Sequence, residues 1–306
     1  MINKDFNSIL DLLKTFSTEQ ICINHLEELR WNGNVTSPFD PTSKVYTCKD
    51  NKYRCKNTGK YFNVRTATLF DNTKVPLQKW FLAIWLVTSH KKGISSIQLS
   101  KDIDVTQKTA WFMLQRIRNC FGFDNEGELG NQVEVDETFV GGKNKNRHES
   151  KKVEFSQGRS VKDKSPVVGM VERGGKLIAK QVEDTKLETL TREITKRVNK
   201  SASVFTDEWM GYNALSRIYD HSVIKHNASE YVNGHIYTNT IEGFWSLLKR
   251  GIFGIYHFTS KKHLQKYVDE FVFRYNTRNF AEPQRFNMLL SNTEYRLTYK
   301  ELINEK

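Results

Sequence analysis

The sequence predicts an α/β protein with a mixed sheet and flanking helices, preceded by a mainly helical region that contains a small β-ribbon. Residues 5–30 and 76–121 carry apolar side chains at helical spacing. Residues 31–66 are polar and rich in turn-forming residues, with the short β-prone runs KVYTC and KYFNV. From residue 132 onward, β-prone and helical segments alternate.

Composition and charge narrow the class of partner. The chain has 306 residues, of which 38% are hydrophobic, and this is enough for two or three domains with a proper core. Its net charge of +12 favours a polyanionic partner, either nucleic acid or an anionic membrane surface. A basic protein without such a partner is the alternative.

The sequence argues against membranes and secretion. The N-terminus carries acidic residues and lacks a long apolar core, so it does not resemble a signal peptide. The longest apolar run, at 80–87, is too short to cross a bilayer. Four cysteines do not make a disulfide scaffold. We therefore expect a cytoplasmic protein without a membrane partner.

Residues 93–118 have the pattern of a helix-turn-helix. Ser95 or Ser96 can cap a first helix, the run DIDV forms a turn, and Thr106 can cap a second helix. In such motifs the start of the second helix reads bases in the major groove of DNA. The residues expected to contact DNA are Gln107 and Lys108 at base edges, and Arg116 and Arg118 near phosphates. An ordinary packed helical hairpin is the alternative.

The predicted elements after residue 131 follow a β-β-β-α-β-α-β-α order. They are a strand at 133–140, a basic loop at 141–165, the strands PVVGMVE and KLIAKQV, a helix across 186–200, the strand SVFTD, a helix near 209–218, the strand SVIKH, and a long helical section from about 239. A mixed sheet with helices around it follows from this order.

Acidic residues stand inside the first of these strands. Strand alternation places Glu134, Asp136 and Thr138 on one face and leaves Glu137 on the apolar side. A carboxylate in a packed sheet is costly unless something compensates it. We therefore expect Asp136 to have a chemical role and Glu137 to support the structure around it.

Two further acids complete a possible metal site. Asp207 ends the strand SVFTD, and Glu242 lies in a helix with Lys249 two turns later on the same face. Taken alone, Asp207 could be a helix cap and Glu242 a solvated residue. Together, the three carboxylates suit two divalent cations, and Lys249 with Arg250 suits DNA phosphate.

These segments resemble a known family. VEVDETFVGGKNKNRH, FTDEWMGYNAL and the block from His235 to Arg278 resemble the catalytic core of DDE transposases from bacterial insertion sequences, in the group related to eukaryotic Merlin elements. KVPLQKWFLAIWLVTSHKKGISSIQLSKDIDVTQKTAWFMLQRIR resembles that group's DNA-binding region. The match covers roughly residues 25 to 280.

The resemblance implies an RNase H-like fold with Asp136, Asp207 and Glu242 as ligands of two Mg²⁺ or Mn²⁺ ions. It implies cleavage of double-stranded DNA at transposon ends by water, followed by attack of the freed 3′-OH on target DNA. It also implies a homo-oligomer on DNA, associated with the bacterial nucleoid. Asn239 is an alternative third ligand, because some members use Asn there.

The sequence departs from the family in its ribbon. Family members carry two C-x2-C zinc knuckles, whereas here those positions hold Ser37, Asp40, Cys55 and Thr58. Three of these four residues are poor zinc ligands, and Cys48 with Cys55 still provides only two of the four ligands that a structural zinc needs. We therefore expect no zinc.

The four expected parts are residues 1–66 (helices and ribbon), 67–122 (helix-turn-helix), 132–282 (catalytic domain) and 283–306 (tail). Two other functions stay open. One is a non-cleaving helix-turn-helix protein derived from a transposase, and the other is an RNase H-like nuclease unconnected to transposition.

Overall fold

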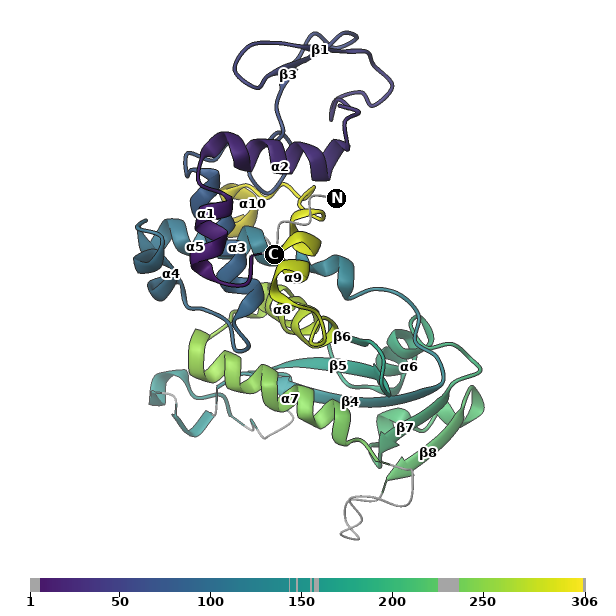
Figure 1. Cartoon of the computed structure of the whole chain (residues 1–306). Helices are drawn as coiled ribbons and strands as arrows, with labels where there is room; N and C mark the ends of the chain where they lie inside the picture. The colour runs from purple at the N-terminus through teal and green to yellow at the C-terminus, as the bar shows by residue number, and fades with distance from the viewer. Residues whose placement is uncertain are drawn as a thin grey trace. The chain divides into compact units, whose positions relative to one another are not determined.

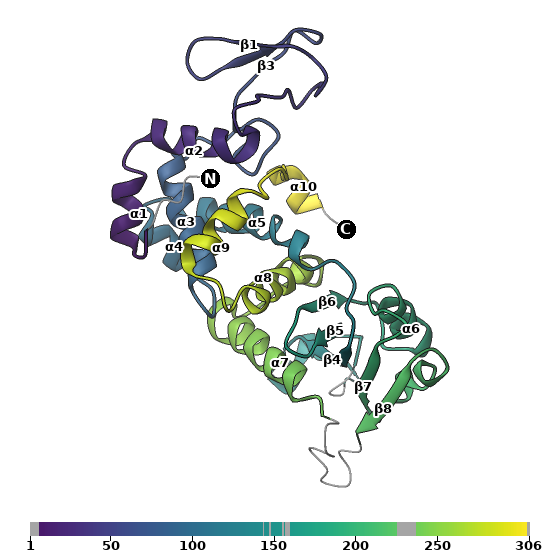
Figure 2. The same cartoon turned by 45° about the vertical axis from the view of Figure 1, so that its right-hand side comes forward.

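A computed structural model describes residues 6–142, 144–146, 148–154, 156, 160–224 and 237–304. The chain forms two compact units (Figures 1 and 2). Unit 1 comprises Met1–Phe121 and Asn279–Lys306, and unit 2 comprises Gly122–Arg278. The structure thus groups the chain differently from the four parts expected, because residues 283–306 fold with the N-terminal region.

Unit 2 is built on a five-stranded mixed sheet in the order β6-β5-β4-β7-β8. Its strands are β4 (Gln132–Val140), β5 (Ser165–Glu172), β6 (Leu177–Gln181), β7 (Ser203–Asp207) and β8 (Asp220–Ile224). β4, β5 and β6 are antiparallel neighbours, whereas β4, β7 and β8 run parallel. This is the mixed five-stranded sheet with flanking helices that the sequence predicted, with β4 at its centre.

Helices cover both faces of the sheet. On one face, Val133 and Val135 share a core with Leu190 and Ile194 of α6 (Leu187–Thr195). The other face packs against α7 (Asn239–Gly251) and α8 (Leu264–Asn276). Figures 1 and 2 both show α7 lying along β4 and β5. The face that carries Glu134 and Asp136 is therefore the face covered by α7.

Some predicted elements of unit 2 were wrong in detail. The expected helix near 209–218 is two 3₁₀ turns, Met210–Tyr212 and Leu215–Arg217, where Gly211 lies tightly against Leu190 and leaves no space for a Cβ atom. The helix across 186–200 ends at Thr195. The C-terminal helical section is interrupted after α7 by a π-helical turn, Ile252–Tyr256. Residues 225–226 of the expected strand SVIKH lie outside the described residues.

Unit 1 is mainly helical. Its helices are α1 (Ile9–Thr15), α2 (Glu19–Trp31), α3 (Leu77–Ser89), α4 (Ser96–Asp102), α5 (Gln107–Arg118), α9 (Glu282–Leu290) and α10 (Tyr299–Asn304). Phe16, Phe81 and Phe286 form mutual ring contacts at its centre, with centroid separations of 4.8 to 5.9 Å. Since Phe286 belongs to α9, the last part of the chain completes this core.

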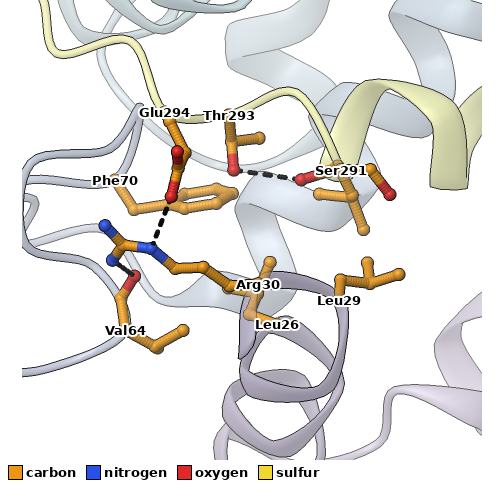
Figure 3. A pocket seen from close by; sticks show the side chains of 9 residues that line it. Leu26, Leu29, Arg30, Val64, Phe70, Ser291, Thr293 and Glu294 are labelled. Atoms are coloured by element: carbon orange, nitrogen blue, oxygen red, sulfur yellow. Dashed lines mark hydrogen bonds and ion pairs between the residues drawn. The ribbon is translucent and has the colours of Figure 1, made fainter. Parts of the chain in front are cut away.

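Within unit 1, a polar contact also joins the C-terminal segment to the N-terminal part of the chain (Figure 3). Arg30 of α2 donates through Nε to Glu294 at 3.0 Å and through Nη1 to the carbonyl oxygens of Val64 at 2.9 Å and Thr66 at 3.0 Å. One side chain thus joins α2, the segment that follows the ribbon, and the segment that follows α9.

The ribbon is a three-stranded antiparallel sheet of β1 (Val45–Thr47), β2 (Tyr53–Cys55) and β3 (Tyr61–Phe62). At its base the Cys55 thiol is buried. Burial raises the pKa of this thiol, but hydrogen bonds from Ser43, Thr58 and Ser37 outweigh burial and bring the pKa to about 6. Hydroxyl groups therefore surround Cys55 where the resemblance would place zinc ligands.

Within the described part of the chain, no helix is both long and apolar enough to cross a membrane.

Candidate active site

Strand β4 divides its acidic residues between the two faces of the sheet. Glu134 accepts hydrogen bonds from the backbone N–H groups of Thr240 and Ile241, at the start of α7. Glu137 faces the other way and accepts a hydrogen bond of 2.6 Å from the Tyr212 hydroxyl. The alternation that the sequence predicted for this strand is confirmed.

One open pocket of about 370 Å³ gathers the predicted site residues. Its lining comprises Asp136, Glu137, Thr138, Asp207, Thr238, Glu242, Trp245, Ser246 and Lys249. β4 supplies Asp136, the parallel neighbour β7 supplies Asp207 at its end, and α7 supplies Glu242 and Lys249. Three acids far apart in the sequence and one lysine therefore meet at one place. Asn239 is exposed at the first residue of α7 and does not line this pocket.

Each of the three acids is oriented by a hydrogen bond from a neighbour. Asp136 accepts through Oδ2 from the Trp245 indole N–H at 2.9 Å. Asp207 accepts through Oδ1 from the backbone N–H of Trp209 at 3.0 Å, and Glu242 accepts through Oε1 from the Thr238 hydroxyl at 3.3 Å. Because Asp207 bonds two residues ahead and begins no α-helix, it is a turn-forming acid and not the helix cap that the sequence left open.

The electrostatics of the pocket disfavour negative charge. Burial, followed by the charges of Glu137 and Asp207, raises the pKa of Asp136 to about 7, although the Trp245 hydrogen bond acts in the opposite direction. Burial and the neighbouring Glu137 raise the pKa of the Tyr212 hydroxyl well above its ordinary value. A positive group in this pocket would therefore be strongly favoured.

The donor set fits a hard divalent cation. In the described residues, no three His, Cys, Asp or Glu side chains are arranged as a preformed metal site. The three pocket carboxylates nevertheless offer only oxygen donors, which Mg²⁺ and Mn²⁺ prefer, and the repulsion that Asp207 exerts on Asp136 is what a cation would relieve. Asp136, Asp207 and Glu242 are the residues that could hold it.

The residues expected to contact DNA differ in accessibility. Lys249 is exposed in the pocket, and Arg250 is exposed next to it with its Nε donating to the Ser246 carbonyl at 3.1 Å. Gln107 and Lys108 are exposed at the start of α5. Gln107 donates to the Ser96 hydroxyl at 2.8 Å, and the Lys108 ammonium lies 5.1 Å from the centre of the Tyr299 ring.

The prediction for Arg116 and Arg118 was wrong. Their exposed fractions are 5% and 1%, so neither side chain is available to a phosphate. Arg116 instead donates to the carbonyl oxygens of Leu297 at 3.0 Å and Asp71 at 2.6 Å. The face of α5 that packs into unit 1 is wide enough to include both arginines.

The sequence did not reveal how Trp245 meets the sheet. Its indole hydrogen bond to Asp136 is possible because Gly169, the partner of Asp136 in the β4–β5 ladder, has no side chain. A Cβ atom at Gly169 would lie 2.7 Å from the Trp245 ring and 2.8 Å from Ile241. A glycine inside the apolar run VVGMV was the available signal, since such a residue often marks a close approach.

Comparison with known proteins agrees with this geometry. Residues 128–276 match the model of the ISXO2-like transposase domain, a range that lies within unit 2. Over 278 residues the chain is 30% identical to the "Uncharacterized protein in transposable element ISH50" of Halobacterium salinarum. The aligned region covers 86% of this chain and 92% of that protein. The chain belongs to the ISXO2-like transposases. The family that the sequence predicted, an insertion-sequence transposase, is confirmed.

Solved structures show weaker likeness to this transposase. The Mos1 strand transfer complex is 12% identical, with coverage of 71% of this chain and 78% of that chain and a TM-score of 0.25. A pre-cleavage Mos1 transpososome gives a TM-score of 0.24 at 12% identity, with coverage of 94% and 97%. A simian T-cell lymphotropic virus intasome in complex with PP2A regulatory subunit B56 gamma gives a TM-score of 0.28 at 13% identity. The match covers 62% of this chain and 68% of that chain. At TM-scores this low, the likeness assigns no residue a role.

Proposed function

We propose that this transposase cuts DNA at the ends of its element by metal-dependent hydrolysis and then joins the freed 3′-OH to target DNA. Asp136, Asp207 and Glu242 hold the metal ions, and Lys249 contacts a phosphate beside them. The observation that carries this proposal is the meeting of these four side chains in one pocket. Asn239 does not line that pocket, which favours Glu242 as the third ligand.

The pocket residues would have different roles in the reaction. Two bound Mg²⁺ or Mn²⁺ ions supply activation of the attacking oxygen and stabilisation of the leaving oxygen. Trp245 fixes one carboxylate oxygen of Asp136 and so orients the other. Asp136 would release its remaining proton on binding a cation, because its pKa of about 7 leaves it partly protonated at neutral pH. Lys249 places a positive charge where a phosphate must lie.

Recognition of DNA is assigned to unit 1 and to the basic end of α7. Gln107 and Lys108 are exposed at the start of α5, the second helix of the α4–α5 pair, and would read bases. Arg250 follows Lys249 and would contact the backbone of double-stranded DNA. The protein would act as a homo-oligomer that pairs two ends, in the bacterial cytoplasm at the nucleoid.

A second candidate is a transposase-derived DNA-binding protein that no longer cuts. The hydroxyl-lined ribbon favours it, because Ser37 and Thr58 replace thiolates expected from the family resemblance. The intact set of three acids in one pocket favours the enzyme more strongly.

Cleavage assays separate the two candidates. Wild type would be incubated with DNA carrying the inverted repeats of its element and Mg²⁺ or Mn²⁺, beside Asp136→Asn, Asp207→Asn and Glu242→Gln. We expect each substitution to lower the cleavage rate at least about 100-fold, since metal stabilisation of the transition state provides several kcal/mol. Binding of the DNA ends, measured by gel shift, should persist.

The control is Glu172→Gln, which changes a half-buried carboxylate of β5 that lies outside the pocket and should cleave like wild type. Binding without nicking by wild type would support the non-cleaving candidate. Equal cleavage by wild type and Asp136→Asn would refute the site assignment instead.

A further inference from the structure

A buried ion pair lies beside the proposed metal site without belonging to it. Glu134 and Arg173 approach within 2.9 Å, and their side chains are 0% and 11% exposed. Glu134 precedes Asp136 by two residues on β4 and faces the same side of the sheet. A buried ion pair is often no more stabilising than an apolar pair of the same volume, so its presence calls for a more specific explanation.

Glu134 takes the place of a helix cap for α7. Its Oε2 accepts from the backbone N–H groups of Thr240 at 2.9 Å and Ile241 at 3.1 Å, and its Oε1 accepts from the Thr240 hydroxyl at 2.9 Å. N–H groups in the first turn of a helix have no partner within the helix. The residue before α7, Thr238, makes no capping hydrogen bond with its side chain. A carboxylate from the central strand therefore binds the positive end of α7.

Arg173 holds both Glu134 and the residue that leads into α7. It donates through Nε to Glu134 and through Nη2 to the carbonyl of Tyr237 at 2.7 Å. Its guanidinium lies 3.7 Å from the centre of the Tyr237 ring and 4.2 Å from that of Phe205. The position of the Glu134 carboxylate is thus fixed from two sides.

We propose that Glu134, held by Arg173, is a positioning residue that sets where Glu242 stands relative to Asp136. One strand carries both Glu134 and Asp136, and Glu134 binds the two residues that precede Glu242 on α7. The spacing of two proposed metal ligands is then determined by one rigid strand and one buried contact. This inference rests on the proposed function and adds two residues that do not line the pocket.

The first test measures α7 itself, without metal or DNA. Glu134→Gln keeps the size of the side chain but removes its charge and half of its acceptor capacity. We expect amide hydrogen exchange at residues 240–242 to accelerate at least about tenfold, while exchange in the β5–β6 ladder stays unchanged. The same chemical change at Glu172 serves as the control, because that side chain accepts a hydrogen bond from the Asn131 amide and, among the described residues, has no hydrogen bond to α7.

The second test separates positioning from general stability. Mn²⁺ binding would be measured by calorimetry in wild type, Glu134→Gln, Glu242→Gln and the double variant. We expect Glu134→Gln to weaken binding about tenfold when Glu242 is present, as is typical for residues that orient a ligand, and to have little effect when residue 242 is Gln. Equal weakening in both backgrounds would overturn the inference.

Two outcomes distinguish this inference from the proposed function. If wild type binds no Mn²⁺, the proposed metal site fails, and the exchange measurement alone decides whether Glu134 fixes α7. Unchanged exchange at 240–242 would overturn the inference even in an active enzyme. Should Glu134→Gln fail to fold, Thr240→Val removes only the 2.9 Å hydroxyl contact and should accelerate the same amides to a smaller extent.

Discussion

Asp136 occupies an unfavourable position for a negative charge. It stands on the central strand, next to Glu137 and across from Asp207, and its pKa of about 7 reflects burial first and those two charges second. The Trp245 hydrogen bond offsets only part of this cost. Without a cation, Asp136 is therefore only partly ionised at neutral pH, and its ionisation at higher pH costs the folded protein stability.

The pKa shift predicts a pH-dependent effect of Asp136→Asn on stability. The folded state binds the proton more tightly than the unfolded chain, whose pKa is 3.8. This contribution to stability is complete below about pH 3.8 and is lost as the pH rises to about 7, at a total cost of at most about 4 kcal/mol. In EDTA, we expect Asp136→Asn to become progressively more stable than wild type across this range and the gain to level off above it.

Urea unfolding at a series of pH values would measure this difference. Mn²⁺ added in place of EDTA should reduce this difference, because a cation bound at the proposed site would stabilise wild type and not the variant. A stability difference that is independent of pH would contradict the raised pKa of Asp136.

At the residue scale, the sequence predicted more of the pocket than of the surface expected to contact DNA. Asp136 stood out because acids are rare inside strands, and alternation placed Glu137 on the other face. The burial of Arg116 and Arg118 was not predictable, because it depends on how far α5 is rotated into the rest of unit 1. Local spacing defines an apolar face but does not set its width.

The helix α7 joins the pocket to the core, and its two glycines have different surroundings. A Cβ atom at Gly251 would lie 2.0 Å from the Phe271 ring of α8, whereas one at Gly243 would have no neighbour within 4 Å. Close packing of α7 on α8 thus depends on Gly251, and Gly243 contributes only backbone freedom.

These surroundings predict opposite effects of the same substitution. Gly243→Ala should stabilise the protein by about 0.5–1 kcal/mol through helix propensity. Gly251→Ala should destabilise it by about 1–3 kcal/mol or more, because the methyl group must displace the Phe271 ring or α8 itself. Chemical denaturation of both variants would measure the two changes. Destabilisation by both, to a similar extent, would contradict this description of the α7–α8 contact.

At the element scale, periodicity predicted the existence and order of most helices and strands. It failed at 209–218, where the chain forms 3₁₀ turns against α6. Apolar residues such as Tyr212 and Leu215 are buried in either arrangement, so their spacing alone does not distinguish a helix from turns. The short strands of the ribbon could be predicted from the sequence. The hydroxyl groups around Cys55 could not, because they come from separate segments that only the folded chain brings together.

For the whole molecule, the division into units predicts how fragments should behave. Residues 122–278 form unit 2 without a break, so this fragment should fold alone and unfold cooperatively. Residues 1–121 should be much less stable alone, since they lack Phe286 and the carbonyl of Leu297 that Arg116 binds. Adding a peptide of residues 279–306 should restore part of that stability.

Circular dichroism would follow the thermal unfolding of both fragments. The fragment of residues 1–121 would be measured with and without the peptide of residues 279–306. A fragment of residues 1–121 that melts like the intact unit, or a fragment of residues 122–278 that does not fold, would contradict the division. The sequence did not predict this division, because α9 packs against α3, about 200 positions earlier, for example through the ring contact of Phe286 with Phe81, and local patterns carry no information about such distant partners.

The split of unit 1 between two stretches of chain also affects the order of events during translation. The ribosome releases residues 122–278 before residues 279–306, so unit 2 can finish folding while unit 1 still lacks α9 and α10. Under the proposed function, the site that cuts DNA is then complete before α4 and α5, which would select DNA, belong to a fully folded unit 1. A messenger truncated within the last 28 codons would yield a chain with an intact unit 2 and an unfinished unit 1.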